Sequence, residues 1–158
     1  MLALETLNTK YPSEDWLHIY TDGSLSDQID GAGAGGTSRF FSFYKSVGHQ
    51  TTNFDGEVEA IHSALQHTFP WLQKCKHIVI LSDSKAAIQA IGTTSCPKME
   101  KIKEIQHMIN QIQNLGKNIV LHGYQLIVEF VEMKELIYWQ KRAQKLNKKT
   151  TLNFHLNQ

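Results

Sequence analysis

The stretch "HIYTDGS", residues 18–24, decides the fold. Residues 17–22 alternate apolar or β-branched side chains with polar or aromatic ones, and this period of two predicts a β-strand. We expect the strand to end at Asp22, because Gly23 and Ser24 favour a tight turn. The pattern fits either an ordinary strand-to-turn transition or a functional carboxylate held at a fixed place.

Length and composition bound the class of protein. The 158 residues predict one domain that is large enough to bury a hydrophobic core, and 41% of them are apolar. The net charge of +1 neither implies nor excludes a nucleic-acid partner. Cys75 and Cys96 lack metal-ligand spacing, which favours reduced thiols in a cytoplasmic or nuclear protein. Without a signal peptide or a long apolar run, we expect no membrane association. We expect a monomer.

The first half of the chain predicts a lead-in, a meander and a helix. Residues 1–16 read as a lead-in or linker remnant of a longer open reading frame. The glycines of "GAGAGG", residues 31–36, lack the Lys-Ser/Thr of a phosphate loop, so they favour a strand that another backbone approaches closely. Alternating aromatic residues follow at Phe41 and Phe43, and the whole stretch predicts a two- or three-stranded antiparallel meander.

Residues 53–69, "NFDGEVEAIHSALQHTF", change to helical period, with Asn53 or Asp55 as the expected N-cap. Glu57 lies in line with the apolar face of this helix, whereas Glu59 is expected to point to solvent. A carboxylate on the buried face is costly unless something pairs with it. The alternative is a charge that simply favours the helix start.

A second strand also ends at an aspartate. Within "HIVILSDS", residues 77–84, Ile78 to Leu81 form a continuous apolar run, as expected of a strand covered on both faces, and the strand stops at Asp83. A helix to Gly92, an amphipathic helix within residues 97–118 and a strand over residues 118–124 follow.

These elements predict an α/β fold with a mixed sheet and three converging carboxylates. Sites form at the carboxyl ends of parallel strands, so Asp22, Asp83 and the helical Glu57 are expected to meet there. Carboxylates that converge repel one another unless divalent cations neutralise them. Hard oxygen ligands favour Mg²⁺ or Mn²⁺.

Three motifs carry a family resemblance. "YTDGS", "GEVEAIHSAL" and "ILSDSKAAI", in this order and at these separations, resemble type 1 ribonuclease H, and more narrowly the ribonuclease H domain of arthropod non-LTR retrotransposons. The resemblance covers residues 17–121. It implies a ribonuclease H-like fold, with a mixed five-stranded sheet, an antiparallel meander and helices packed on both faces.

The resemblance also implies a reaction and its site. Two Mg²⁺ ions, replaceable by Mn²⁺ and about 4 Å apart, would hydrolyse the RNA strand of an RNA–DNA hybrid. Asp22 would bridge the ions, with Glu57 and Asp83 each holding one. Gly23 and Ser24 would lie beside the RNA, where 2′-hydroxyls distinguish RNA from DNA. A reverse transcriptase domain encoded upstream is the expected partner.

The last part of the chain departs from the family. The family's final segment supplies a histidine loop and a fourth metal-binding aspartate, but residues 122–158 contain no aspartate. The segment from His122 to Ala143 can be back-translated with a suitable choice of codons. When this nucleotide sequence is read in the frame that starts at its third nucleotide, it encodes "WVPAHCGICGNERADILAKKG", which is the missing motif. We therefore expect residues 122–158 to be an out-of-frame tail that follows one nucleotide loss after Leu121.

Parts of this shifted sequence do not depend on codon choice. Met133-Lys134 forces Glu, Tyr138-Trp139 forces Leu and Trp139-Gln140 forces Ala, all at motif positions. Loss of the fourth carboxylate is expected to impair activity. Two alternatives stay open: a non-catalytic nucleic-acid-binding remnant of a retrotransposon ribonuclease H, and another two-metal chemistry such as that of a transposase or integrase.

Overall fold

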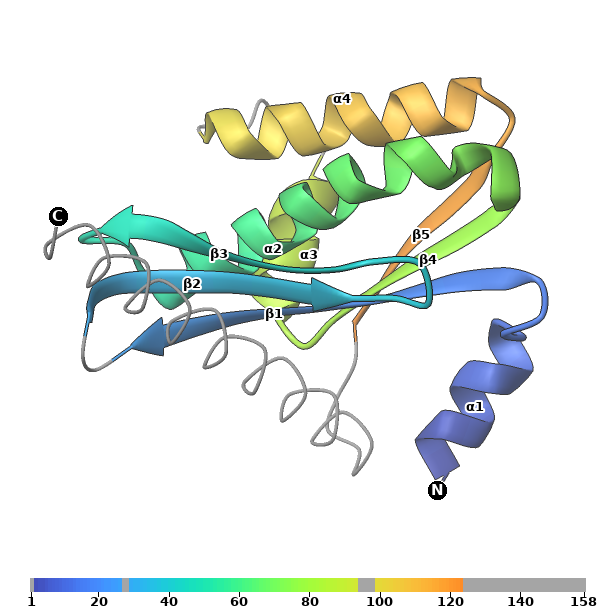
Figure 1. Cartoon of the computed structure of the whole chain (residues 1–158), viewed down its shortest axis with the longest axis horizontal. Coiled ribbons are helices and arrows are strands. Elements are labelled where there is room, and N and C mark those ends of the chain that lie inside the picture. The colour runs from blue at the N-terminus through green and yellow to red at the C-terminus, as the bar shows by residue number, and fades with distance from the viewer. Residues whose placement is uncertain (1, 27–28, 94–98, 124–158) are drawn as a thin grey trace, which may run out of the picture.

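Five strands form a single mixed sheet in the computed structural model, which describes residues 2–26, 29–93 and 99–123 (Figure 1). The strands are β1 (Trp16–Ser26), β2 (Ile29–Thr37), β3 (Ser42–His49), β4 (His77–Ser82) and β5 (Asn118–Gly123). The helices are α1 (Leu2–Lys10), α2 (Asn53–Thr68), α3 (Lys85–Gly92) and α4 (Glu100–Asn114), with a 3₁₀-helix η1 (Phe69–Lys74) after α2.

The strand order is β3-β2-β1-β4-β5. β1, β2 and β3 pair antiparallel, whereas β4 pairs parallel with both β1 and β5. The predicted mixed sheet with an antiparallel meander is therefore confirmed. The glycine-rich residues 31–36 lie inside β2, as the strand prediction requires, and do not form a phosphate loop.

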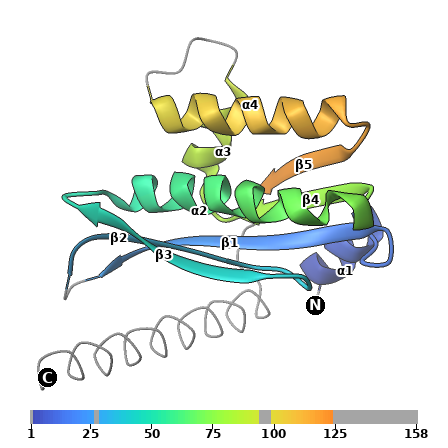
Figure 2. The same cartoon turned by 45° about the horizontal axis from the view of Figure 1, so that its top comes forward.

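Helices cover both faces of the sheet. Figure 2 shows α2, α3 and α4 on one side of the sheet and α1 on the other. The main core lies between the sheet and the first group, and its largest fully buried side chains include Leu17, Ile19, Ile61, Leu65, Ile78, Ile80 and Ile105. Because β4 is covered on both faces, its run of apolar residues is continuous rather than alternating.

The predicted lead-in, residues 1–16, contains α1, which packs on the sheet. Leu7 and Tyr11 are buried against Val79 and Leu81 of β4. Leu7 lies in α1, and Tyr11 directly follows the last residue of the helix, with its backbone N–H donating to the Leu7 carbonyl at 2.7 Å. At the other end of the chain, β5 continues to Gly123, two residues beyond the boundary predicted at residue 121.

Two local predictions about α2 are wrong. Thr52 is the N-cap, and Asp55 instead completes a capping box, with its carboxylate accepting from the Thr52 backbone N–H. Glu59 is buried rather than solvent-exposed, because cations from β3 and α4 surround it. The expectations about residues 124–158, including the out-of-frame tail, lie outside the described residues.

Candidate functional site

The parallel register of β1 and β4 brings two aspartates to the same level of the sheet. The pairing of these strands runs from Trp16 and His77 to Tyr20 and Leu81. Two residues beyond each of the last partners lie Asp22 and Asp83. The meeting of both aspartates at the carboxyl ends of parallel strands follows from this register.

The expected turn after Asp22 is replaced by a longer strand. β1 continues to Ser26, because Gly23 and Ser24 pair with Ala34 and Gly33 of β2. The antiparallel pairing of β1 with β2 therefore continues past Asp22. Asp22 is thus held by a strand on both sides, which fixes its backbone more firmly than a turn would.

Hydrogen bonds hold the backbone around both aspartates. Thr21, one residue before Asp22, donates its hydroxyl to the Leu81 carbonyl at 3.0 Å and ties β1 to β4. On the other side, the Ser82 hydroxyl accepts from the Ser84 backbone N–H at 3.1 Å across Asp83. Ser84 is also the N-cap of α3. Asp83 therefore sits in a short, bonded turn between β4 and α3.

Glu57 reaches the same place from α2. Its side chain comes from the second turn of the helix, whose start the capping box fixes. Ligand atoms of Asp22, Glu57 and Asp83 all lie within 4.8 Å of one another. Asp22 and Glu57 are 8% and 4% exposed, and Asp83 is half-buried. The structure thus brings together all three carboxylates predicted from the sequence.

The donor set of this carboxylate centre fits a divalent cation. Three carboxylates at this separation repel one another, and a bound cation turns that repulsion into attraction. All ligand atoms are hard oxygens, which suit Mg²⁺ or Mn²⁺ better than a soft metal. Asp83 is the most solvent-accessible of the three carboxylates.

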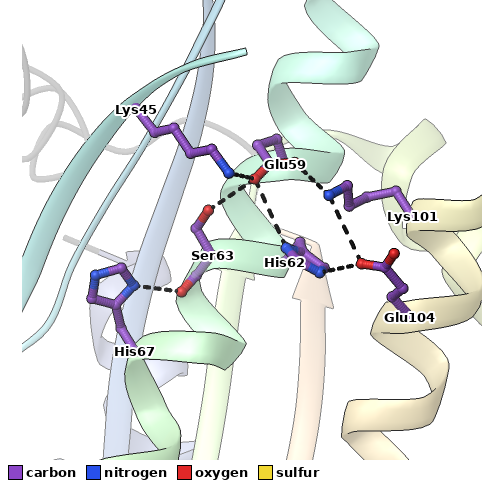
Figure 3. Close-up of polar contacts among 7 residues, drawn as sticks. All are labelled: Lys45, Glu59, His62, Ser63, His67, Lys101 and Glu104. Atoms are coloured by element: carbon purple, nitrogen blue, oxygen red, sulfur yellow. Dashed lines mark hydrogen bonds and ion pairs between the residues drawn. The ribbon is translucent and has the colours of Figure 1, made fainter.

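A second buried carboxylate, Glu59, lies on the same helix in very different surroundings (Figure 3). Glu59 Oε1 accepts from Lys45 Nζ of β3 at 2.6 Å, and Glu59 Oε2 lies 3.3 Å from Lys101 Nζ of α4. His62 Nε2 contacts Glu104 Oε2 at 2.7 Å. We call Lys45, Glu59, His62, Lys101 and Glu104 the Glu59 network.

The Glu59 network shifts two pKa values. Burial raises the pKa of Glu59, but the hydrogen bond from Lys45 and the charges of Lys101, Lys45 and His62 together hold it below its ordinary value. Burial lowers the pKa of His62, Lys101 adds to this, and the nearby carboxylates only partly oppose it. The network therefore favours an ionised Glu59 beside a neutral His62.

Sequence reasoning missed this network. Glu59 departs from the apolar face of α2, and no local pattern shows that lysines of β3 and α4 reach it. The only sequence signal is the pairing of Glu59 with His62 at three-residue spacing, which places both on one side of a helix. The network ties α2 to two other elements and so helps fix the helix that carries Glu57.

Comparisons with known proteins agree with this architecture. The RNase H family model matches residues 14–151. RNase H1 from the halophilic archaeon Halobacterium salinarum NRC-1 is similar in structure, with a TM-score of 0.53, 14% identity, and coverage of 69% of this chain and 85% of that one. No curated protein sequence matches the chain.

A second similar structure is LC11-RNase H1, isolated from compost by a metagenomic approach. Its TM-score is 0.53 at 22% identity, and the match covers 70% of this chain and 84% of that one. At such identities these two structures show a shared fold and nothing more. The strand order and the helices on both faces are those of the RNase H fold.

The chain belongs to the RNase H family, because the family match spans most of its 158 residues. The resemblance to type 1 ribonuclease H is thereby confirmed. This family acts on RNA–DNA hybrids and generally uses divalent metals. In the part of the chain that the structure describes, no helix is long and apolar enough to cross a membrane.

Proposed function

We propose that this domain hydrolyses the RNA strand of an RNA–DNA hybrid with two Mg²⁺ ions, which Mn²⁺ can replace. The observation that carries the proposal is the convergence of Asp22, Glu57 and Asp83 within an RNase H fold. Asp22 would bridge the two ions, with Glu57 and Asp83 each holding one. Such ions, when bound, activate water and stabilise the charge that develops at the scissile phosphate.

The other residues of the site orient the substrate. Gly23 and Ser24 continue β1 directly beyond Asp22, so their backbone lies next to one of the three carboxylates. Contacts from this backbone to 2′-hydroxyls would select RNA over DNA. Recognition through backbone and shape implies little dependence on base sequence.

We propose further that the chain derives from an arthropod non-LTR retrotransposon and that residues 122–158 are out of frame. The absence of aspartate from that segment and the shifted reading of His122 to Ala143 support this origin. A reverse transcriptase domain encoded upstream is the proposed partner, in the cytoplasm or nucleus. With the fourth carboxylate lost, activity of this chain is expected to be impaired.

A non-catalytic remnant that binds nucleic acid is the second candidate, favoured by the same missing aspartate. Both candidates share the fold and differ in turnover. The genomic locus tests the origin directly: it should encode the shifted motif one frame away from the tail. A locus that cannot be read in this way excludes the frameshift.

Hybrid cleavage by the 158-residue chain, in Mg²⁺ and in Mn²⁺, tests the function. A frame-restored protein and its Asp22→Asn variant serve as controls. We expect the frame-restored protein to cut the RNA strand and Asp22→Asn to lower the rate at least about a thousandfold, because the bridging carboxylate supplies several kcal/mol. Efficient cleavage by the Asp22→Asn variant would overturn the site, and cleavage of duplex DNA instead would indicate a different two-metal chemistry.

A further inference from the structure

We propose that Gly23 is a positioning residue for Glu57. Because Gly23 has no side chain, the turn of α2 that carries Glu57 packs directly against β1. This inference rests on the proposed function, since it concerns how the carboxylate centre is assembled. It gives Gly23 a role in the protein itself, in addition to the proposed backbone contact with RNA.

The distances around Gly23 carry the inference. A Cβ atom built on Gly23 would lie 2.7 Å from the Gly56 carbonyl carbon and 2.9 Å from the Glu57 carboxyl carbon, and closer still to the Glu57 backbone nitrogen. Real Cβ atoms essentially never approach other atoms below 3.0 Å. Any side chain at position 23 would therefore displace the very group that forms the carboxylate centre.

The contact is reciprocal. A Cβ built on Gly56 would meet the Gly33 carbonyl oxygen at 2.8 Å, the Ala32 Cβ at 3.2 Å and the Gly23 α-carbon at 3.4 Å. A glycine is unfavourable inside a helix, yet Gly56 stands one residue before Glu57. Glycines on both sides of the interface let the helix backbone approach the strands this closely.

Backbone conformation does not explain the glycine at position 23. Positive φ angles occur, among the described glycines, at Gly31, Gly48 and Gly116, but not at Gly23. An alanine could therefore adopt the local backbone without strain. What alanine would change is the space between β1 and α2, and with it the distance between the carboxylates of Asp22 and Glu57.

A cation titration followed by thermal unfolding tests the inference. The variant is Gly23→Ala, and the matched control is Gly92→Ala, whose added Cβ meets nothing within 4 Å and whose φ is not positive. Mn²⁺ is the probe, and there are two readouts: the melting temperature without cation, and the Mn²⁺ midpoint, which is the Kd fitted to the rise in melting temperature with Mn²⁺ concentration. A merely structural role would lower the first and leave the second unchanged.

We expect Gly92→Ala to stay within twofold of the unmodified chain in Mn²⁺ midpoint, and Gly23→Ala to need at least tenfold more Mn²⁺. If Gly23→Ala does not fold, Gly56→Ala, whose added Cβ makes milder contacts, takes its place. We then expect the Mn²⁺ midpoint of Gly56→Ala to be at least threefold higher than that of the unmodified chain. An unchanged midpoint in a folded Gly23→Ala, or in Gly56→Ala where it decides, overturns the inference. No response to Mn²⁺ in the unmodified chain would instead overturn the proposed metal centre.

Discussion

Glu57 and Glu59 stand two residues apart on one helix and are almost equally buried, at 4% and 5% exposure. Carboxylates lie beside the first of them and lysines beside the second. The ligand atoms of Asp22 and Asp83 lie within 4.8 Å of Glu57, whereas Lys45 and Lys101 contact Glu59. Because successive helical residues are turned by about 100°, side chains two residues apart face different neighbours.

The comparison shows that burial alone does not identify a functional carboxylate. A buried charge is tolerated where cations of the protein compensate it, and Glu59 meets that condition with its own lysines. Glu57 is instead grouped with the carboxylates of Asp22 and Asp83, an arrangement that divalent cations stabilise. The sign of the neighbouring charges therefore separates the structural Glu59 from Glu57, the proposed metal ligand.

Glu57→Gln should have the largest effect on the carboxylate centre. We expect loss of the cation-induced stabilisation, which for the unmodified chain at a Mn²⁺ concentration one hundred times its Kd is about 2.7 kcal/mol, or about 8 °C in melting temperature. Without cation, the variant should be at least as stable as the unmodified chain, because one of three repelling charges is gone. Thermal unfolding with and without Mn²⁺ measures both effects.

If Glu57→Gln keeps the full response to Mn²⁺, the cation binds elsewhere and the contrast between the two glutamates fails. Magnesium should give the same result at higher concentration. A variant that is destabilised without cation would show that Glu57 is compensated within the protein, as Glu59 is.

Glu59→Gln should produce the opposite pattern. We expect a loss of about 2 kcal/mol in the free energy of unfolding, or about 6 °C, because the change removes the charge that Lys45 and Lys101 share. Both lysines are partly exposed and can turn to water, which keeps the loss below that of a fully buried pair. The response to Mn²⁺ should remain.

A surface ion pair supplies the control for Glu59→Gln. Lys103 and Glu100 are 3.3 Å apart, with side chains 46% and 76% exposed. Lys103→Gln should therefore change the free energy of unfolding by less than about 0.5 kcal/mol. Equal effects of Lys103→Gln and Glu59→Gln in chemical denaturation would remove the structural role assigned to the network.

The carboxylate centre could be predicted from the sequence because short-range patterns place its members. A period of two locates Asp22 on a strand, an apolar run locates Asp83 after the next, and helical period puts Glu57 on the inner face. Parallel pairing then brings the strand ends together. The mixed sheet and its antiparallel meander followed from the same patterns, whereas the strand order was not predicted from the sequence.

The Glu59 network and α1 could not be predicted in this way. The partners of Glu59 come from β3 and α4, 14 residues before it and 42 residues after it, and only the packed fold brings them together. Among the residues of this lead-in whose side chains the structure describes, Leu7 of α1 and Tyr11 just after it are buried, and no periodic apolar pattern predicts them. The turn expected after Asp22 gave way to strand pairing with β2, a tertiary contact that outweighs local turn preference.

The smallest expected effect concerns the pH dependence that His62 gives to the network. His62 faces Glu59 on its own helix and Lys101 and Glu104 on α4. Burial and Lys101 hold its pKa below the ordinary value of 6.5. Above that pH, both the folded and the unfolded chain hold a neutral imidazole, so the residue adds no pH dependence there.

Below about pH 6.5 the unfolded chain takes up a proton on this imidazole and the folded chain does not, so stability falls as the pH falls toward the folded pKa. In the His62→Gln variant, residue 62 has no titratable group, so the free energy of unfolding should change less with pH in this range. Denaturant unfolding of both proteins between pH 7 and pH 5 measures the difference in slope. Parallel profiles would mean that His62 takes up its proton equally in both states, and that Glu104 and Glu59 fully offset the cost of burying its charge.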